Sequence, residues 1–147
     1  MTQVDHLIPP SVLSAESAET LYATAYELYR NGKYVDAKGF FRLLSTTHPF
    51  DRRFWIGFGA CFQMLKQYSQ AIECYSVAAV QNPDDPFVHL YAAECFFKNN
   101  NKTLAVQTLE SSLTVAKKSR DHAALISQLE LLRNQWNLQL SGGKHAN

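Results

Sequence analysis

The sequence repeats itself with a period of about 34 residues, and this period constrains the fold more than any other feature of the chain. Ala37, Ala71 and Ala105 follow one another at this spacing, the repeat step. Further positions keep the same step: Phe41 with Tyr75 and Leu109, Pro49 with Pro83, and Asp51 with Asp85. Self-similarity at a fixed period is typical of stacked repeats, in which each unit buries its apolar face against its neighbours.

A period of about 34 residues is that of the tetratricopeptide repeat. The middle unit resembles the pattern of that repeat at eight positions: Trp55, Phe58, Gly59, Phe62, Ala71, Tyr75, Ala78 and Pro83. We therefore predict an all-α fold in which three tetratricopeptide repeats form a short right-handed α-solenoid. The repeats are expected at about 18–51, 52–85 and 86–119.

The two ends of the chain lack the repeat pattern. A last amphipathic helix, at about 121–140, is expected to have Asp121 as its N-terminal cap and to cover the exposed end of the solenoid. Its apolar stripe consists of Leu125, Leu129, Leu132, Trp136 and Leu140. The repeat domain then spans 14–140, between a flexible segment at 1–13 and a disordered tail at 141–147.

Local signals mark the turns and helix starts within the domain. Gly32 and Asn100 tolerate the positive φ that the turn inside a repeat requires, and Lys66 adopts it less comfortably. Asp51 and Asp85 stand where the second and third repeats should begin, and aspartate is a favoured N-cap.

The composition excludes several classes of function. The net charge is +1, with 18% charged and 46% hydrophobic residues, so the chain shows no signature of a nucleic-acid-binding protein. No apolar run approaches the roughly 18 residues of a membrane span, and we expect no membrane insertion. The start shows no secretory signal and the three cysteines form no CxxC pair, which favours reduced thiols in the cytoplasm.

A stripe of tyrosines indicates a binding surface. Tyr22, Tyr26 and Tyr29 follow the spacing i, i+4, i+7 and lie on one face of the first helix. The residues expected to face the core cluster on another side of that helix: Leu21, Thr24, Ala25 and Leu28. We interpret the tyrosines as part of the concave wall of the solenoid.

The repeat step extends this wall into the later repeats. The equivalent positions are Ile56, Ala60 and Gln63 in the second repeat, and Leu90, Glu94 and Phe97 in the third. These nine residues would form an aromatic and aliphatic groove with few charges. Such a groove suits an extended peptide whose apolar side chains are held in pockets and whose backbone is oriented by phenol hydrogen bonds.

Three segments resemble one known family: LYATAYELYRNGKYVDA, RRFWIGFGACFQ and HLYAAECFF. They are similar to the class II chaperones of bacterial type III secretion systems, and the similarity runs from about 14 to 135. The resemblance implies a chaperone in the bacterial cytoplasm that binds two hydrophobic translocator proteins and keeps them soluble, separate and export-competent. It also implies that a client segment with spaced proline and leucine anchors lies in the groove, against Tyr22, Tyr26 and Tyr29.

Other partners and functions stay open at this stage. The resemblance leaves room for a homodimer and for a transcriptional activator as a second partner. The alternative function is a tetratricopeptide scaffold or regulatory protein that binds a folded partner. A co-chaperone that clamps a carboxylate would need basic residues where Tyr22, Tyr26, Phe87 and Tyr91 stand.

No arrangement of residues predicts catalysis, a metal or a cofactor. The histidines are scattered and none has a metal-ligand spacing with a cysteine or carboxylate: His6, His48, His89, His122 and His145. Cys61 and Cys95 stand at equivalent positions of successive repeats, which favours a role as small buried packing residues. We therefore expect a binding protein rather than an enzyme.

Overall fold

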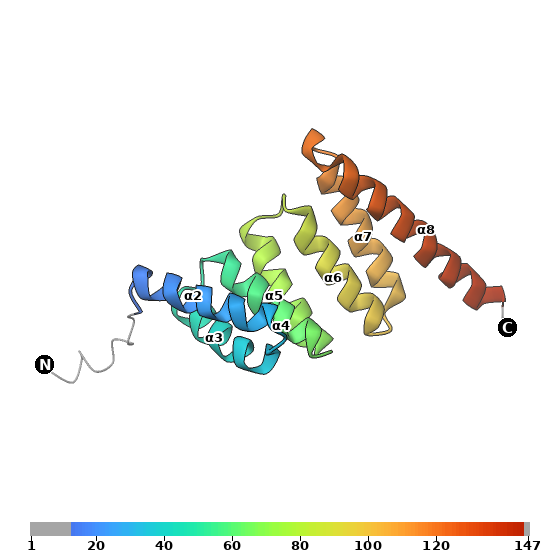
Figure 1. Ribbon diagram of the computed structural model, residues 1–147. Helices are drawn as coiled ribbons and strands as arrows, with labels where there is room; N and C mark the ends of the chain where they lie inside the picture. The colour runs from blue at the N-terminus through green and yellow to red at the C-terminus, as the bar shows by residue number, and fades with distance from the viewer. Residues whose placement is uncertain (1–12, 146–147) are drawn as a thin grey trace, which may run out of the picture.

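The fold of residues 13–145, which the computed structural model describes, is built from helices and contains no strand (Figure 1). In chain order the helices are α2 (Ala15–Arg30), α3 (Tyr34–Thr47), α4 (Arg52–Met64), α5 (Tyr68–Gln81), α6 (Pro86–Lys98), α7 (Lys102–Ala116), the 3-10 turn η1 (Arg120–His122) and α8 (Ala123–His145). The segment predicted to be flexible, 1–13, lies outside the described residues except for Leu13, which packs against the core.

The helices form three consecutive pairs, α2 with α3, α4 with α5 and α6 with α7, followed by α8. Each helix packs against the next one in the chain, so that the array grows in one direction from α2 to α8 (Figure 1). The predicted all-α fold, with three helix pairs and a final helix, is confirmed. The first helices of successive pairs, α2, α4 and α6, share one side of the array.

Aspartates begin the second and third pairs, as predicted. The Asp51 side chain accepts a hydrogen bond of 3.1 Å from the backbone N–H of Arg53. The Asp85 side chain accepts one of 2.9 Å from the backbone N–H of Phe87. Each carboxylate satisfies an amide that the first turn of a helix leaves without an intrahelical partner.

The turn between the two helices of each pair has the same backbone conformation in all three pairs. Its central residue has positive φ: 77° at Gly32, 60° at Lys66 and 62° at Asn100. The next residue donates its backbone N–H to a carbonyl five positions earlier, at 2.8–2.9 Å in all three turns. This Schellman-type pairing satisfies carbonyls that the helix end would otherwise leave open.

The last helix differs from the prediction at both of its ends. Asp121 lies within η1, and the Ser119 side chain accepts the backbone N–H of Asp121 at 3.2 Å, so the assignment of Asp121 as the cap was wrong. The helix begins at Ala123 and continues to His145, which makes 141–145 of the expected tail helical. A glycine such as Gly142 costs a helix only about 1 kcal/mol, and no proline follows to end it.

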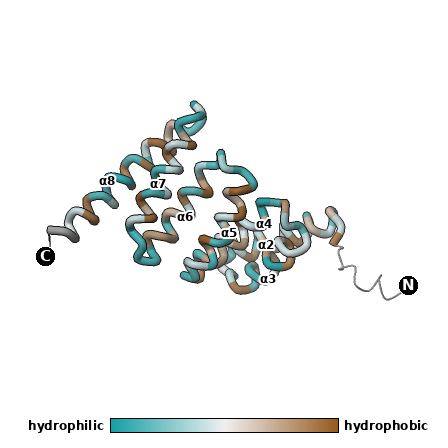
Figure 2. Tube along the Cα trace, turned by 180° about the vertical axis from the view of Figure 1, so that it is seen from behind, coloured by the Kyte–Doolittle hydropathy of each residue, from teal (hydrophilic) through white to brown (hydrophobic). Residues whose placement is uncertain are grey.

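Two clusters of buried side chains form the core. The first joins α2 through α6, and the second joins α6, α7 and α8. Helix α6 contributes to both, with Val88 in the first cluster and Ala93 in the second. Hydrophobic positions recur along every helix, as expected where each helix packs on two neighbours (Figure 2). Thr24, assigned to the core face, is exposed because α2 is the first described helix and carries no neighbour on that side.

Glycines in α4 allow aromatic rings of neighbouring helices to touch its backbone. A Cβ added to Gly57 would overlap the ring of Phe41, which is itself buried. A Cβ added to Gly59 would stand 2.8 Å from a ring carbon of Tyr75. The small residues of the repeat pattern therefore set how closely α3, α4 and α5 approach.

We expect Gly57→Ala to lower the free energy of unfolding by about 1–3 kcal/mol, the usual cost of overpacking a core. Gly39→Ala is the matched control, because Gly39 lies in α3 and a Cβ there would meet no atom within 4 Å. The control should raise stability by up to about 1 kcal/mol. Urea unfolding followed by circular dichroism measures both, and equal stabilities would contradict the role given to Gly57.

Candidate peptide-binding site

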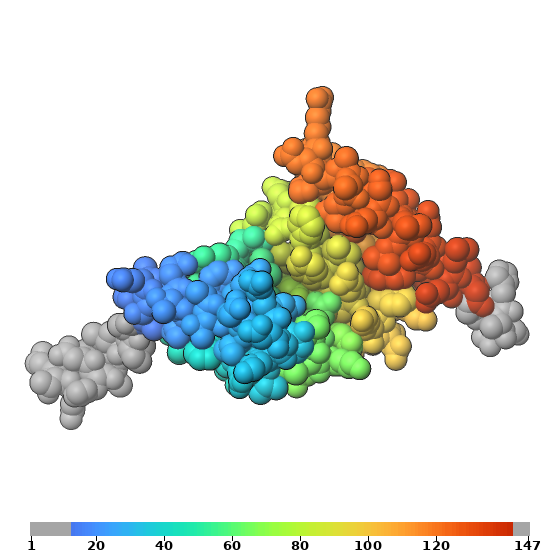
Figure 3. All heavy atoms as spheres, in the orientation of Figure 1, coloured from blue at the N-terminus to red at the C-terminus, as the bar shows by residue number. Residues whose placement is uncertain are grey.

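A cleft of about 510 Å³ opens on the side shared by α2, α4 and α6. Figure 3 shows the surface hollowed between α2, in blue, and α8, in orange and red. Twelve residues line the cleft: Tyr22, Tyr26, Tyr29, Arg53, Ile56, Gly57, Ala60, Gln63, Met64, Tyr75, Tyr91 and Glu94. Five of the twelve are tyrosines, so the lining combines apolar rings with hydroxyl groups that can form hydrogen bonds.

The tyrosine stripe of α2 faces this cleft, and its members differ in burial. Tyr26 is 51% exposed, whereas Tyr22 and Tyr29 are half-buried. The Tyr22 ring lies edge-on to Phe41, with 6.1 Å between centroids, and therefore belongs to the core as well as to the cleft. Burial raises the pKa of Tyr22 and of Tyr29, so both phenols remain protonated donors at neutral pH.

Seven of the nine residues predicted for the groove line this one cleft: Tyr22, Tyr26, Tyr29, Ile56, Ala60, Gln63 and Glu94. Leu90 and Phe97 do not. Leu90 lines an adjoining, smaller cleft between α6 and α8, and Glu94 lines both clefts. The Phe97 ring stacks on Trp136 of α8, with 4.5 Å between centroids and 11° between planes, because α8 covers this end of α6.

The cleft also contains residues that the repeat step did not single out: Arg53, Gly57, Met64, Tyr75 and Tyr91. Tyr91 takes the place expected for Leu90, so the lining moves by one residue on α6. Tyr75 belongs to the core of α5, and only its hydroxyl group points to the groove residue Gln63, at 2.7 Å. For Arg53 a signal exists in the sequence, because Glu19 stands one repeat earlier with the opposite charge.

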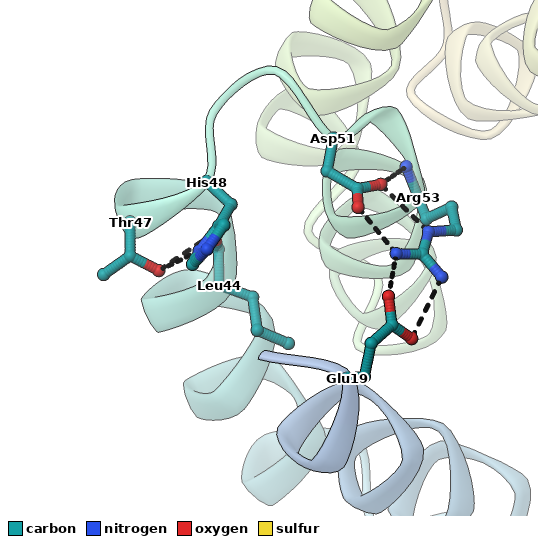
Figure 4. A network of polar contacts seen from close by, with 6 residues as sticks. All are labelled: Glu19, Leu44, Thr47, His48, Asp51 and Arg53. Atoms are coloured by element: carbon teal, nitrogen blue, oxygen red, sulfur yellow. Dashed lines mark hydrogen bonds and ion pairs between the residues drawn. The ribbon is translucent and has the colours of Figure 1, made fainter. Parts of the chain in front are cut away.

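Arg53 lies in the first turn of α4 and is held by two carboxylates (Figure 4). It donates to Asp51 at 3.0 and 2.6 Å and to Glu19 of α2 at 2.6 and 3.3 Å. Its guanidinium also lies 4.8 Å from the centroid of the Tyr22 ring. The Arg53 hydrogen bonds lower the pKa of Asp51 and of Glu19. One guanidinium between two carboxylates leaves this cluster with a net negative charge.

A second polar group lies at the other end of α4. The Tyr75 hydroxyl donates to Gln63 Oε1 at 2.7 Å, and Gln63 Nε2 donates to Glu94 Oε2 at 3.2 Å. Burial raises the pKa of the Glu94 carboxyl, and the Gln63 hydrogen bond opposes this shift. Three helices, α4, α5 and α6, thus place one carboxylate in the wall of a mainly aromatic cleft.

The cysteines are packing residues, as the sequence indicated. Cys61, Cys74 and Cys95 are buried, and burial raises the pKa of each thiol to about 12. Among the residues with described side chains, no group of three His, Cys, Asp or Glu could hold a metal ion. None of the described helices is long and apolar enough to cross a membrane.

We expect the native thiols to resist Ellman's reagent at about pH 8, where an unperturbed cysteine reacts readily. The thiolate is the nucleophile, and a raised pKa together with burial leaves almost none of it accessible. All three thiols should react once the chain is unfolded in guanidinium chloride. Absorbance of the released thiolate measures both states, and prompt reaction without denaturant would contradict the buried placement.

Comparisons with known proteins place this site in a family context. A model of the tetratricopeptide repeat matches residues 18–47 and 54–85. Low calcium response locus protein H of Yersinia pestis is 38% identical over 86 residues, which cover 58% of this chain and 51% of that protein. This match therefore spans about half the length of the curated relative.

Solved structures match over a larger share. PcrH of Pseudomonas aeruginosa, crystallised in complex with the chaperone binding region of PopD, is similar with a TM-score of 0.82 and 30% identity, over 86% of this chain and 96% of that one. The Yersinia enterocolitica chaperone SycD, in complex with a peptide of the translocator YopD, is similar with a TM-score of 0.80 and 30% identity, over 86% and 97%. Since the likeness extends over nearly all of both proteins, the chain belongs to the family of type III secretion translocator chaperones.

Proposed function

We propose that this chain is a cytoplasmic chaperone of bacterial type III secretion. Its clients are hydrophobic translocator proteins, and an extended apolar segment of the client binds in the cleft between α2, α4 and α6. The bound chaperone keeps the client soluble and prevents premature association with a second translocator. The function is binding, without a chemical reaction and without a cofactor.

The observation that carries the proposal is the tyrosine-lined cleft on a translocator-chaperone fold. A concave, mainly apolar cleft with a few convergent polar groups is the usual form of a binding site. The relatives PcrH and SycD have been crystallised with the chaperone binding region of PopD and with a peptide of YopD. The cleft offers apolar rings for client side chains and phenol groups for the client backbone.

The expected affinity is moderate. Each apolar anchor that leaves water contributes about 1.5–3 kcal/mol, and micromolar binding needs about 8 kcal/mol. About three to five anchors supply this energy before the cost of ordering the peptide is subtracted. A cleft of about 510 Å³ accommodates a few such side chains rather than a folded domain. A client held in this way can be released when the secretion machinery engages it.

Further partners are included in the proposal. SycD has been crystallised in an alternative dimer, and we propose that this chain also forms a homodimer. A transcriptional activator is a second candidate partner. Both would use surfaces other than the cleft, since a client fills the cleft itself.

We expect Tyr26→Ala to weaken binding of a fluorescein-labelled peptide with spaced proline and leucine anchors by about tenfold or more. Tyr26 is half-exposed in the cleft, so its truncation removes contact area without opening the core. Fluorescence anisotropy of the labelled peptide measures the dissociation constant. Phe50→Ala is the matched control, because Phe50 is a 91% exposed aromatic residue outside the cleft.

The control should bind the peptide as the wild type does. Equal binding by wild type and Tyr26→Ala would place the peptide elsewhere on the molecule. A peptide that binds neither protein would favour the alternative, a scaffold that recognises a folded partner.

A further inference from the structure

Glu94 places a carboxylate in the mainly aromatic cleft, where the binding of apolar client side chains does not require one. It lies on α6 between the α4 residue Gln63 and the rings of Tyr75 and Tyr91. Of the twelve lining residues, Arg53 and Glu94 are the two that carry a charge. Arg53 lies in the first turn of α4 and Gln63 in the last, about 15 Å apart along the helix axis. The two charged groups therefore stand at opposite ends of the cleft.

The hydrogen-bond network fixes how Glu94 is presented. A phenol hydroxyl donates most readily to an oxygen, so the Tyr75 hydroxyl holds Gln63 Oε1 at 2.7 Å. The amide nitrogen of Gln63 must then face Glu94 Oε2, at 3.2 Å. Among residues 13–142, this is the hydrogen bond that the Glu94 carboxylate accepts, and no cation pairs with it within 4.0 Å. A carboxylate accepts about four hydrogen bonds, and the partly exposed Glu94 therefore keeps acceptor sites open to water or to a ligand.

The nearby cations do not neutralise Glu94. Arg53 pairs with both Asp51 and Glu19, and the two negative charges of these carboxylates exceed its single positive charge. Lys98 lies one turn further along α6 and is exposed. It attracts the Glu94 carboxylate electrostatically but forms no ion pair with it within 4.0 Å. The cleft therefore has an unbalanced negative charge at its α6 end.

This charge destabilises the unliganded chain. Burial raises the pKa of Glu94, which means that the folded state favours the protonated form. The protonated Glu94 carboxyl therefore favours the folded state below the ordinary glutamate pKa of 4.5. This contribution to the free energy of unfolding is lost as the pH rises through the raised pKa of Glu94 in the folded state. At neutral pH the ionised carboxylate thus lowers stability. Carboxyl groups with shifted pKa values occur more often at binding and catalytic sites than elsewhere.

We propose that Glu94 selects client segments that carry a lysine or arginine beside their apolar anchors. The basic side chain of the client donates to the free oxygen of Glu94, while its apolar stem lies along Tyr91 and the anchors occupy the tyrosine wall. A client with an acidic residue at this place is rejected by charge repulsion. The inference rests on the proposed function, because it names the chemistry of the segment that the cleft binds.

A charge scan of the peptide tests this directly. Peptides with identical proline and leucine anchors carry Lys, norleucine or Glu at each position between the anchors in turn. We expect one position at which Lys binds wild type about tenfold more tightly than Glu, with norleucine between them. In E94Q, which keeps the size and the hydrogen bond from Gln63, the three peptides should bind within about twofold of one another.

The matched control is Glu73→Gln. Glu73 is an exposed acid on α5 outside the cleft, so this variant should keep the full preference for Lys. The E94Q variant should also melt at the same or a higher temperature than wild type at neutral pH. If the Glu94 charge stabilised the fold instead, E94Q would melt at a lower temperature than wild type. Glu94→Met provides a second test of the same preference, without a charge and with similar volume.

The outcomes separate the two proposals. If peptides bind and Tyr26→Ala weakens them, but Lys and Glu bind equally at every position, the inference about Glu94 is wrong and the groove stands. A preference for Lys that persists in E94Q and Glu94→Met also overturns it, and indicates the Glu19 and Asp51 end of the cleft. The inference is also wrong if the norleucine and Lys peptides bind equally and both bind more tightly than the Glu peptide. That result would indicate that a backbone N–H of the client donates to Glu94. Failure of every peptide to bind wild type would overturn the proposed function together with this inference.

Discussion

Contact between small side chains and aromatic rings holds the stack of helices together. Ala37, Ala71 and Ala105, related by the repeat step, have no solvent exposure. Phe41 packs on the backbone at Gly57, and Tyr75 packs on the backbone at Gly59. Small residues recur at the position of Ala37 and at that of Gly59, which is Ala25 in the first repeat and Ala93 in the third, so successive pairs pack with a similar offset. The first helices of the pairs then line up on one side, and the cleft is the space between them.

Tyr75 connects this packing to the polar part of the cleft. Its ring is buried against Gly59, and its hydroxyl group orients the amide of Gln63, which faces Glu94. The position of the carboxylate is therefore set by the core rather than by a flexible surface loop. Such rigid placement is what selective recognition of a client side chain requires, since a donor gains most when its acceptor is already in place.

Ion pairs near the starts of the helices act across the repeats in a similar way. Arg53 joins Glu19 of the preceding first helix, one repeat earlier in the chain, and Arg52 joins Asp85 at 2.6 Å. The Arg53–Glu19 pair is largely exposed, and such surface pairs add little stability on their own. The two pairs also connect the N-terminal parts of α2, α4 and α6 to one another. The single guanidinium of Arg53 also covers the Tyr22 ring and limits the cleft at that end.

Much of the fold follows from local rules that act within one repeat. The period, the caps at Asp51 and Asp85 and the left-handed turn residues depend on sequence neighbours only, and their predictions are confirmed. The tyrosine face of α2 also follows from helical geometry. The third repeat is where the prediction failed, because a constant repeat step assumes that every helix keeps the same orientation and the same neighbours.

Helical periodicity and a fixed repeat length need no distant contacts, so the all-α repeat architecture and most of the cleft lining could be predicted from the amino-acid sequence. Which part of the third repeat stays open depends on how the helices pack in three dimensions. Helix α8 stacks Trp136 on Phe97 and covers that part of α6, while Tyr91 replaces Leu90 in the cleft. The same packing brings Gln63, Tyr75 and Glu94 into one network. These residues come from three helices, and how the helices rotate against each other depends on the packing of the whole stack.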